Sequence, residues 1–106
     1  MANNFSDATV AISNNSLTTI FTASNKSLVI AGTLSNTGGT AINVTLKKTD
    51  ASASTDFSIL TNAPLPSGSS LELPKIVLQS SDIIKAQSDN SSGNLTVALQ
   101  LLTDVS

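Results

Sequence analysis

Apolar and polar residues alternate with a period of two along most of this 106-residue chain. Strict alternation predicts β-strands with one buried face. In "TAINVTLKK" one face collects Ile42, Val44 and Leu46, and in "DFSIL" one face collects Phe57 and Ile59. In "NLTVALQLLTDV" one face collects Leu95, Val97, Leu99, Leu101 and Val105. "SLVIAGTL" places Leu28 and Ile30 in phase but is apolar on both faces, which predicts a central strand covered on two sides.

The pattern predicts strands near residues 8–13, 16–22, 27–35, 40–48, 56–62, 69–78, 82–88 and 94–105. "SSDIIKAQS" could also cap one helical turn, but its alternation favours a strand. Short strands at this spacing are typical of sandwiches. The expected fold is an all-β, antiparallel β-sandwich of about eight strands, jelly-roll or Ig-like, as a single domain over residues 1–106.

Four turn-rich stretches separate these strands. "SNTGGT" predicts a hairpin, because Gly38 and Gly39 can both take positive φ. "ASAST" predicts a small polar loop, and "SDNSSGN" a hairpin turn before the last strand. "NAPLPSGSS" is restricted by its prolines and then turns at Gly68.

The most constrained stretch runs from Pro64 to Asp82. Pro64 and Pro66 each lack an amide donor, so they predict an edge strand or a connection, and Pro74 predicts a bend where the strand changes sheet or becomes an edge. We expect Gly68→Val to unfold or aggregate the domain and Glu72→Gln to leave folding intact. The expected facing is Leu71 and Leu73 inward with Glu72 outward, then Ile76 and Leu78 on one face with Val77 opposite.

Charge is sparse: 5 basic against 7 acidic residues, for a net charge of −2. A nucleic-acid partner would need a Lys/Arg stripe to displace counterions, so none is expected. Lys47–Lys48, the one adjacent basic pair, is expected at a solvated strand end. The chain has neither a basic amphipathic helix nor a long apolar run, so no membrane partner is expected.

The residue types present argue against an enzyme, because histidine and cysteine, which are readily poised near neutral pH, are absent. The acidic residues are expected as turn-formers or solubilising charges. Asp89–Asn94 faintly resembles the start of a calcium loop but lacks its further carboxylates. Tyr and Trp, the usual platforms for carbohydrate, are also absent. We therefore predict no catalytic, cofactor-binding or metal residue and no cofactor.

A small aliphatic β-domain with little charge is suited to assembly. Its edge strands carry few lysines or inward charges to protect them, so a partner subunit could cover them. This favours a homo-oligomer or a docked subunit over a free monomer.

The segment from Ser54 to Val105 resembles small phage virion proteins. The similarity lies in "DFSILTNAPLP", then "SGSSLEL", then "KIVLQSSDIIKAQSDNSSGNLTVALQLLTDV". In those proteins a similar Pro-x-Gly-Ser-x-x-Glu-Leu turn leads into an apolar strand, and the chain closes with a long alternating strand. The resemblance implies a β-sandwich accessory component of the particle, on the capsid surface or in the tail.

The resulting hypothesis is a non-enzymatic virion structural protein, a capsid decoration or cement protein or a tail-associated subunit. Its partners would be other virion proteins, namely major capsid or tail proteins, and its location the virion. The alternative is an Ig-like module of a bacterial surface or adhesion protein. "MANNFSDATV" has no basic and apolar stretch of the kind found in signal peptides, which counts against that alternative.

Overall fold

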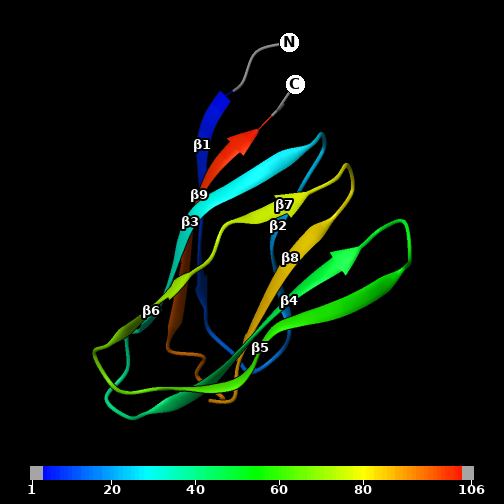
Figure 1. The fold of residues 1–106 in the computed structure, drawn as a ribbon. Coiled ribbons are helices and arrows are strands. Elements are labelled where there is room, and N and C mark those ends of the chain that lie inside the picture. The colour runs from blue at the N-terminus through cyan, green and yellow to red at the C-terminus, as the bar shows by residue number, and fades with distance from the viewer. Residues whose placement is uncertain (1–3, 104–106) are drawn as a thin grey trace.

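A computed structural model describes residues 4–103 of the chain, which form nine β-strands in two antiparallel sheets (Figure 1). The strands are β1 (Asn4–Ile12), β2 (Thr18–Thr22), β3 (Ser27–Asn36), β4 (Ile42–Asp50), β5 (Thr55–Leu65), β6 (Ser70–Leu73), β7 (Ile76–Leu78), β8 (Ile83–Ser88) and β9 (Leu95–Thr103). Sheet 1 has the order β1-β9-β3-β6, with β7 also paired to β3, and sheet 2 has the order β2-β8-β4-β5. The predicted all-β sandwich is confirmed.

The strand pairs are nested around one central hairpin. β4 pairs with β5, and moving outward along the chain β3 pairs with β6 and β7, β2 with β8, and β1 with β9. The chain is thus one long hairpin folded over on itself, and the β3–β9 and β4–β8 pairs join it into two sheets. This arrangement is a jelly roll. In an Ig-like domain the first two strands pair in one sheet, whereas here β1 and β2 lie in different sheets.

The core is a layer of aliphatic side chains between the two sheets. Its buried members are Ile12, Ile20, Ala23, Val29, Leu34, Ile42, Val44, Leu46, Leu65, Leu73, Leu78, Ile84, Ala86, Leu95, Val97, Leu99 and Leu101. β9 contributes four of them at alternate positions, as its period of two predicts. Burial of these side chains is the main favourable term that holds the two sheets together.

Strand β3 departs from simple alternation at Ile30. The pairing with β9 shifts between Val29 and Ala31, so Ile30 is an extra residue in a β-bulge. Val29 faces the core before the bulge and Leu34 faces it afterwards, which places core residues at odd and then at even positions. β3 is central, as predicted, but Leu28 and Ile30 are half-buried and lie outside the core layer.

The connection from β3 to β4 is not the hairpin that Gly38–Gly39 predicted. It crosses from sheet 1 to sheet 2, and neither glycine has positive φ. The buried Asn36 shapes this turn. Its Nδ2 donates to the carbonyls of Thr40 (2.8 Å) and Leu65 (3.0 Å), and its Oδ1 accepts from Gly38 N–H (2.9 Å). The side chain replaces backbone pairing that a hairpin would have supplied.

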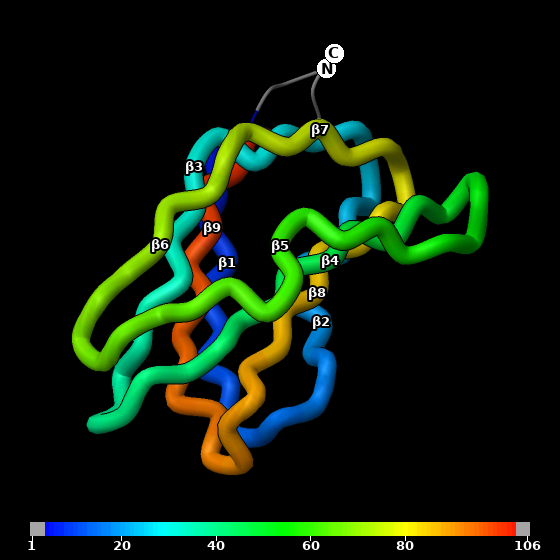
Figure 2. Tube along the Cα trace, turned by 60° about the horizontal axis from the view of Figure 1, so that its bottom comes forward, coloured from blue at the N-terminus to red at the C-terminus, as the bar shows by residue number. Residues whose placement is uncertain are grey.

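The stretch Asp89–Asn94 also crosses between sheets, from β8 to β9, so the predicted hairpin turn is wrong there as well. Gly93 has φ +75° and Asn94 φ +56°, and Gly93 N–H donates to the Asn90 carbonyl at 2.8 Å. Residues 51–54 form the polar loop that "ASAST" predicted. This loop closes the β4–β5 hairpin, which projects beyond the rest of the chain in Figure 2.

The stretch from Pro64 to Asp82 behaves largely as predicted. Pro64 lies in β5, the edge strand of sheet 2, and Pro66 lies in the connection that follows. Pro74 divides the expected strand into β6 and β7, but both pair with β3, so the chain becomes an edge and does not change sheet. The expected facing is also confirmed: Leu73 and Leu78 are buried, Leu71 and Ile76 half-buried, and Glu72 and Val77 exposed.

The predicted strand positions agree with the structure within a few residues, except that β1 begins earlier, at Asn4, and β5 continues to Leu65. "SSDIIKAQS" contains strand β8, so the preference for strand over helix is confirmed. The predicted facing of Val105 lies outside the described residues.

Two glycines with nearly equal φ provide a matched test of this fold. A Cβ at Gly93 would overlap the Ile12 carbonyl oxygen, whereas nothing lies within 4 Å of a Cβ at Gly68 (φ +72°). Gly68→Ala should cost about 1–2 kcal/mol of unfolding free energy, from the left-handed backbone alone. Because the space around Gly68 is open, Gly68→Val should reduce the free energy of unfolding less than the sequence alone led us to expect. Gly93→Ala should cost about 3 kcal/mol or more, because backbone must move.

Urea unfolding followed by far-UV circular dichroism would measure both variants, since the chain has no Trp for fluorescence. Equal destabilisation by the two substitutions would contradict the close approach of Gly93 to β1.

Candidate protein-contact surface

Within residues 4–103, no group of three or more His, Cys, Asp or Glu side chains is placed to hold a metal ion, and no pocket opens. Asp89, the start of the faint calcium-loop resemblance, accepts a hydrogen bond from Asn43 N–H at 2.9 Å. This contact fixes the start of β4 against the turn after β8.

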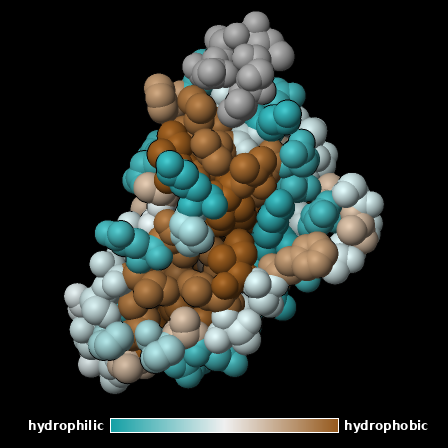
Figure 3. Space-filling model, viewed as in Figure 1, coloured by the Kyte–Doolittle hydropathy of each residue, from teal (hydrophilic) through white to brown (hydrophobic). Residues whose placement is uncertain are grey.

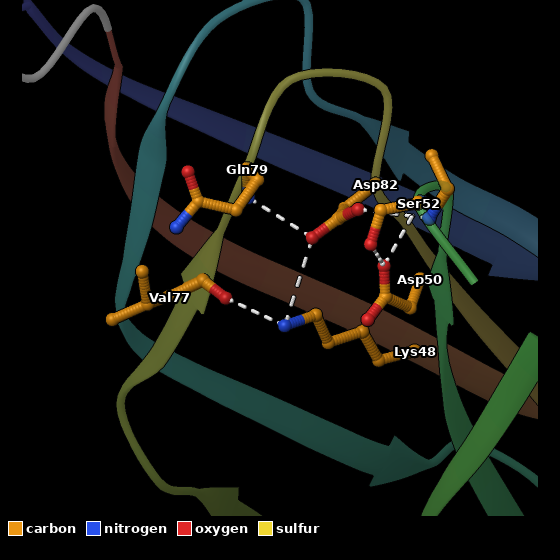
Figure 4. A network of polar contacts seen from close by, with 7 residues as sticks. Lys48, Asp50, Ser52, Val77, Gln79 and Asp82 are labelled. Atoms are coloured by element: carbon orange, nitrogen blue, oxygen red, sulfur yellow. Dashed lines mark hydrogen bonds and ion pairs between the residues drawn. The ribbon is translucent and has the colours of Figure 1, made fainter.

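One acidic residue, Asp82, is buried, with 2% of its surface exposed. Its carboxylate accepts hydrogen bonds from the backbone N–H groups of Ala51 and Gln79, both at 3.0 Å. Lys48 Nζ lies 3.6 Å from the same carboxylate and donates to the Val77 carbonyl at 2.9 Å (Figure 4). Asp82 and Lys48 therefore join the β4–β5 hairpin of sheet 2 to β7 of sheet 1 and to the turn before β8.

Two expectations are corrected by this network. Lys48 is not at a solvated strand end, because its side chain is 27% exposed and its amine is paired with a buried carboxylate. Asp82 is in a turn, as expected for an Asp, but it is no solubilising charge. Every buried side-chain nitrogen and oxygen among the described residues has a hydrogen-bond partner.

The acidic residues at the β4–β5 hairpin have lowered pKa values. A hydrogen bond from the Ser52 hydroxyl (2.7 Å) is the main cause of the lowered pKa of Asp50. A hydrogen bond from the Thr49 hydroxyl lowers the pKa of Asp56, aided by Lys85, whose Nζ lies 3.7 Å away. Both carboxylates thus stabilise the hairpin in their ionised form.

The surface is distinguished by its exposed apolar side chains. Three large hydrophobic residues are conspicuous: Phe5 (82% exposed), Phe57 (52%) and Val77 (53%). Isolated exposed apolar residues are ordinary, whereas a contiguous group indicates a contact site. The strand register decides which of these three residues have apolar neighbours.

Phe5 and Val77 are the two ends of one apolar row on the outer face of sheet 1. Phe5 is directly opposite Leu102, Leu102 is opposite Leu28, and Leu28 is opposite Val77. Residues directly opposite on paired strands share a face. We call these four residues the outer row; each comes from a different strand, namely β1, β9, β3 and β7.

Phe57 lies on β5, the edge strand of sheet 2 on the side of the sandwich that β6 and β7 border in sheet 1. Ile59, Leu60 and Ile76 are half-buried there and pack against the core. We call these residues, with Phe57, the open seam. Figure 3, in the orientation of Figure 1, shows an apolar band down the middle of this face, bordered by polar residues on both sides.

Sequence reasoning did not find the outer row. It treated the apolar residues of "SLVIAGTL" as evidence for a covered strand, and it assigned no surface role to Phe5. The signal was present in Val77, which was expected to face away from the core. The row became visible once the register placed Leu28 between Val77 and Leu102.

No helix occurs between residues 4 and 103, so that part of the chain has none long enough to cross a membrane.

No protein-family model matches the chain, and no curated protein matches it. Two similar solved structures are each described as a pentameric capsid protein isolated from metagenomic phage sequences. Both are 22% identical to this chain and cover 94% of it, with TM-scores of 0.48 and 0.49. The chain covers 62% and 60% of those proteins, about three fifths of their length. A likeness of this degree assigns neither a family nor a function to the chain.

Removal of the buried carboxylate tests the polar network. Asp82→Ala would leave the N–H groups of Ala51 and Gln79 without their acceptor, and the Lys48 amine without its carboxylate partner. We expect a loss of about 2–4 kcal/mol in the free energy of unfolding. Glu72→Gln, at an exposed position of β6, is the matched control and should change it by less than about 0.5 kcal/mol. Equal stability of the two variants in urea would contradict a structural role for Asp82.

The lowered pKa values of Asp50 and Asp56 predict a pH dependence. A carboxyl group whose folded-state pKa lies below its ordinary value of 3.8 stabilises the fold above that pH. The stabilisation is lost as the pH falls through the lowered pKa. Between pH 6 and pH 3, the wild type should therefore lose more stability than the Asp50→Asn/Asp56→Asn variant. Parallel stability curves for the two proteins would contradict the assignment.

Proposed function

We propose that the chain is a non-enzymatic structural protein of a phage particle. It would act as a capsid decoration or cement protein or as a tail-associated subunit, bound to an assembled protein lattice. The observation that carries the proposal is the outer row, a line of apolar side chains on an outer sheet face whose other rows consist of polar residues and alanines. No pocket opens among the described residues, and a surface without a pocket suits another protein better than a small molecule.

Two further observations support a virion role. Viral capsid domains are among the proteins built as jelly rolls, although a fold alone does not determine function. The segment Ser54–Val105, which resembles small phage virion proteins, supplies β5 to β9 and with them one strand of every strand pair. The quoted proline-rich stretch forms the end of β5 and the turn after it, and the alternating stretches form strands β8 and β9.

Many copies on a lattice would make a weak contact sufficient. Each copy presents only a few exposed large apolar residues, so one contact alone would be modest. Simultaneous contacts to a lattice raise the effective concentration and hence the overall affinity. The charge-poor surface is in line with contacts that depend on buried apolar area.

No observation specifically favours either of the two alternatives, a bacterial surface module or an enzyme. The alternative of a bacterial surface module rests on an Ig-like domain, whereas the strands of this chain follow the nested order of a jelly roll. An enzyme would need groups poised near neutral pH, and the sequence has no His or Cys.

Mass spectrometry of gradient-purified particles, from a sample that carries this gene, tests the proposal. We expect peptides of this chain in the particle fraction, at many copies per particle. Separation of heads from tails before the measurement would then assign the protein to the capsid or to the tail. Consistent absence from intact particles, with the protein present elsewhere in the same sample, would refute a virion role.

A further inference from the structure

The outer row fits a second copy of the same chain better than it fits a ligand. Its four side chains lie in register across four strands and form a low ridge. The adjacent positions on the same face form rows of mostly small residues: Asp7, Gln100 and Ala31; then Thr9, Ala98, Thr33 and Glu72; then Ala11, Thr96, Ser35 and Ser70. Small side chains allow a second sheet to approach to the usual spacing of about 10 Å.

The charges near the row are placed for self-association. Asp7 lies on β1, two residues beyond Phe5, at one side of the face. Lys75 is exposed in the link before β7, two residues before Val77, at the other side. A two-fold axis parallel to the strands would set β1 of one copy over β7 of the other. Phe5 would then meet the partner's Val77, and Asp7 would approach the partner's Lys75.

We infer that two copies of this chain associate face to face through the outer row, related by a two-fold axis parallel to the strands of sheet 1. Each contact then occurs twice, as in any isologous interface. Leu28 and Leu102 form the centre of the contact, and the opposite charges of Asp7 and Lys75 at its margins set the orientation.

The size of the row indicates how strong this association can be. A standard interface buries about 800 Å² on each partner, about one seventh of the 5429 Å² surface of the chain. The four residues of the row cover less than that, so the contact also includes the polar rows and their water. We therefore expect a dissociation constant in the micromolar range, about 10–100 μM, at which lattice subunits would pair without aggregating.

The inference deepens the proposed function by naming a surface and a partner, yet it can be tested on the isolated chain. Absence from particles would refute the virion role and leave the dimer standing. A strictly monomeric protein would refute the dimer and leave the virion role open to contacts with other proteins.

Sedimentation velocity over a concentration series gives the first test. Wild-type protein should pass from monomer to dimer below about 1 mM. Phe5→Ser should weaken the dimer at least tenfold, because it removes an end of the row. Phe57→Ser is the matched control, an exposed Phe of the open seam, and should leave the dissociation constant within about twofold. Circular dichroism melts would confirm that both variants remain folded.

A charge exchange tests the two-fold orientation. Asp7→Lys and Lys75→Asp should each weaken the dimer about threefold or more at low salt, because each places like charges together twice. The double variant restores opposite charges and should recover wild-type association. A monomer throughout the series, an equal effect of Phe57→Ser and Phe5→Ser, or a double variant no stronger than the single ones would each overturn the inference.

Discussion

The structure depends on burial of one aliphatic layer between the two sheets of the rolled hairpin. Neither sheet can stand alone, because each has an apolar face that only the other covers. The nested pairing of strands allows each sheet to cover the other. It pairs β1 with β9 in one sheet and β2 with β8 in the other, so that strands from both ends of the chain contribute to both sheets. The buried Asp82–Lys48 contact then joins the sheets at one end, where a hairpin and an edge strand would otherwise separate.

Much of the fold could be predicted because its strands alternate cleanly. β9 and the start of β4 show their buried faces directly in the sequence, and the prolines at 64 and 74 mark an edge and an interruption. The two crossings between sheets could not be predicted. A Gly-containing turn is equally compatible with a hairpin and with a crossing, and the choice depends on distant contacts such as that of Asn36 with Leu65. The bulge at Ile30 was missed for a related reason, because an extra residue shifts the alternation without changing its composition.

The contact surface was less accessible to sequence reasoning than the core. An apolar residue on an outer face has the same local pattern as one in the core, and only the register shows that four such residues lie side by side. The same holds for Asp82, whose burial follows from the packing of the β4–β5 hairpin against the turn after β7. Composition alone points to poorly protected strand edges as the contact surface, whereas the exposed apolar row of sheet 1 lies on an outer face and crosses four strands.

Methyl NMR tests most directly whether this jelly roll presents one self-complementary face. A chain of 10.8 kDa is small enough to give resolved methyl spectra. On dilution from about 1 mM, the methyl signals of Leu28, Leu102 and Val77 should shift together with one dissociation constant. Those of Ile59 and Leu60 in the open seam should stay constant. Shifts confined to the seam, or spectra independent of concentration, would contradict the account.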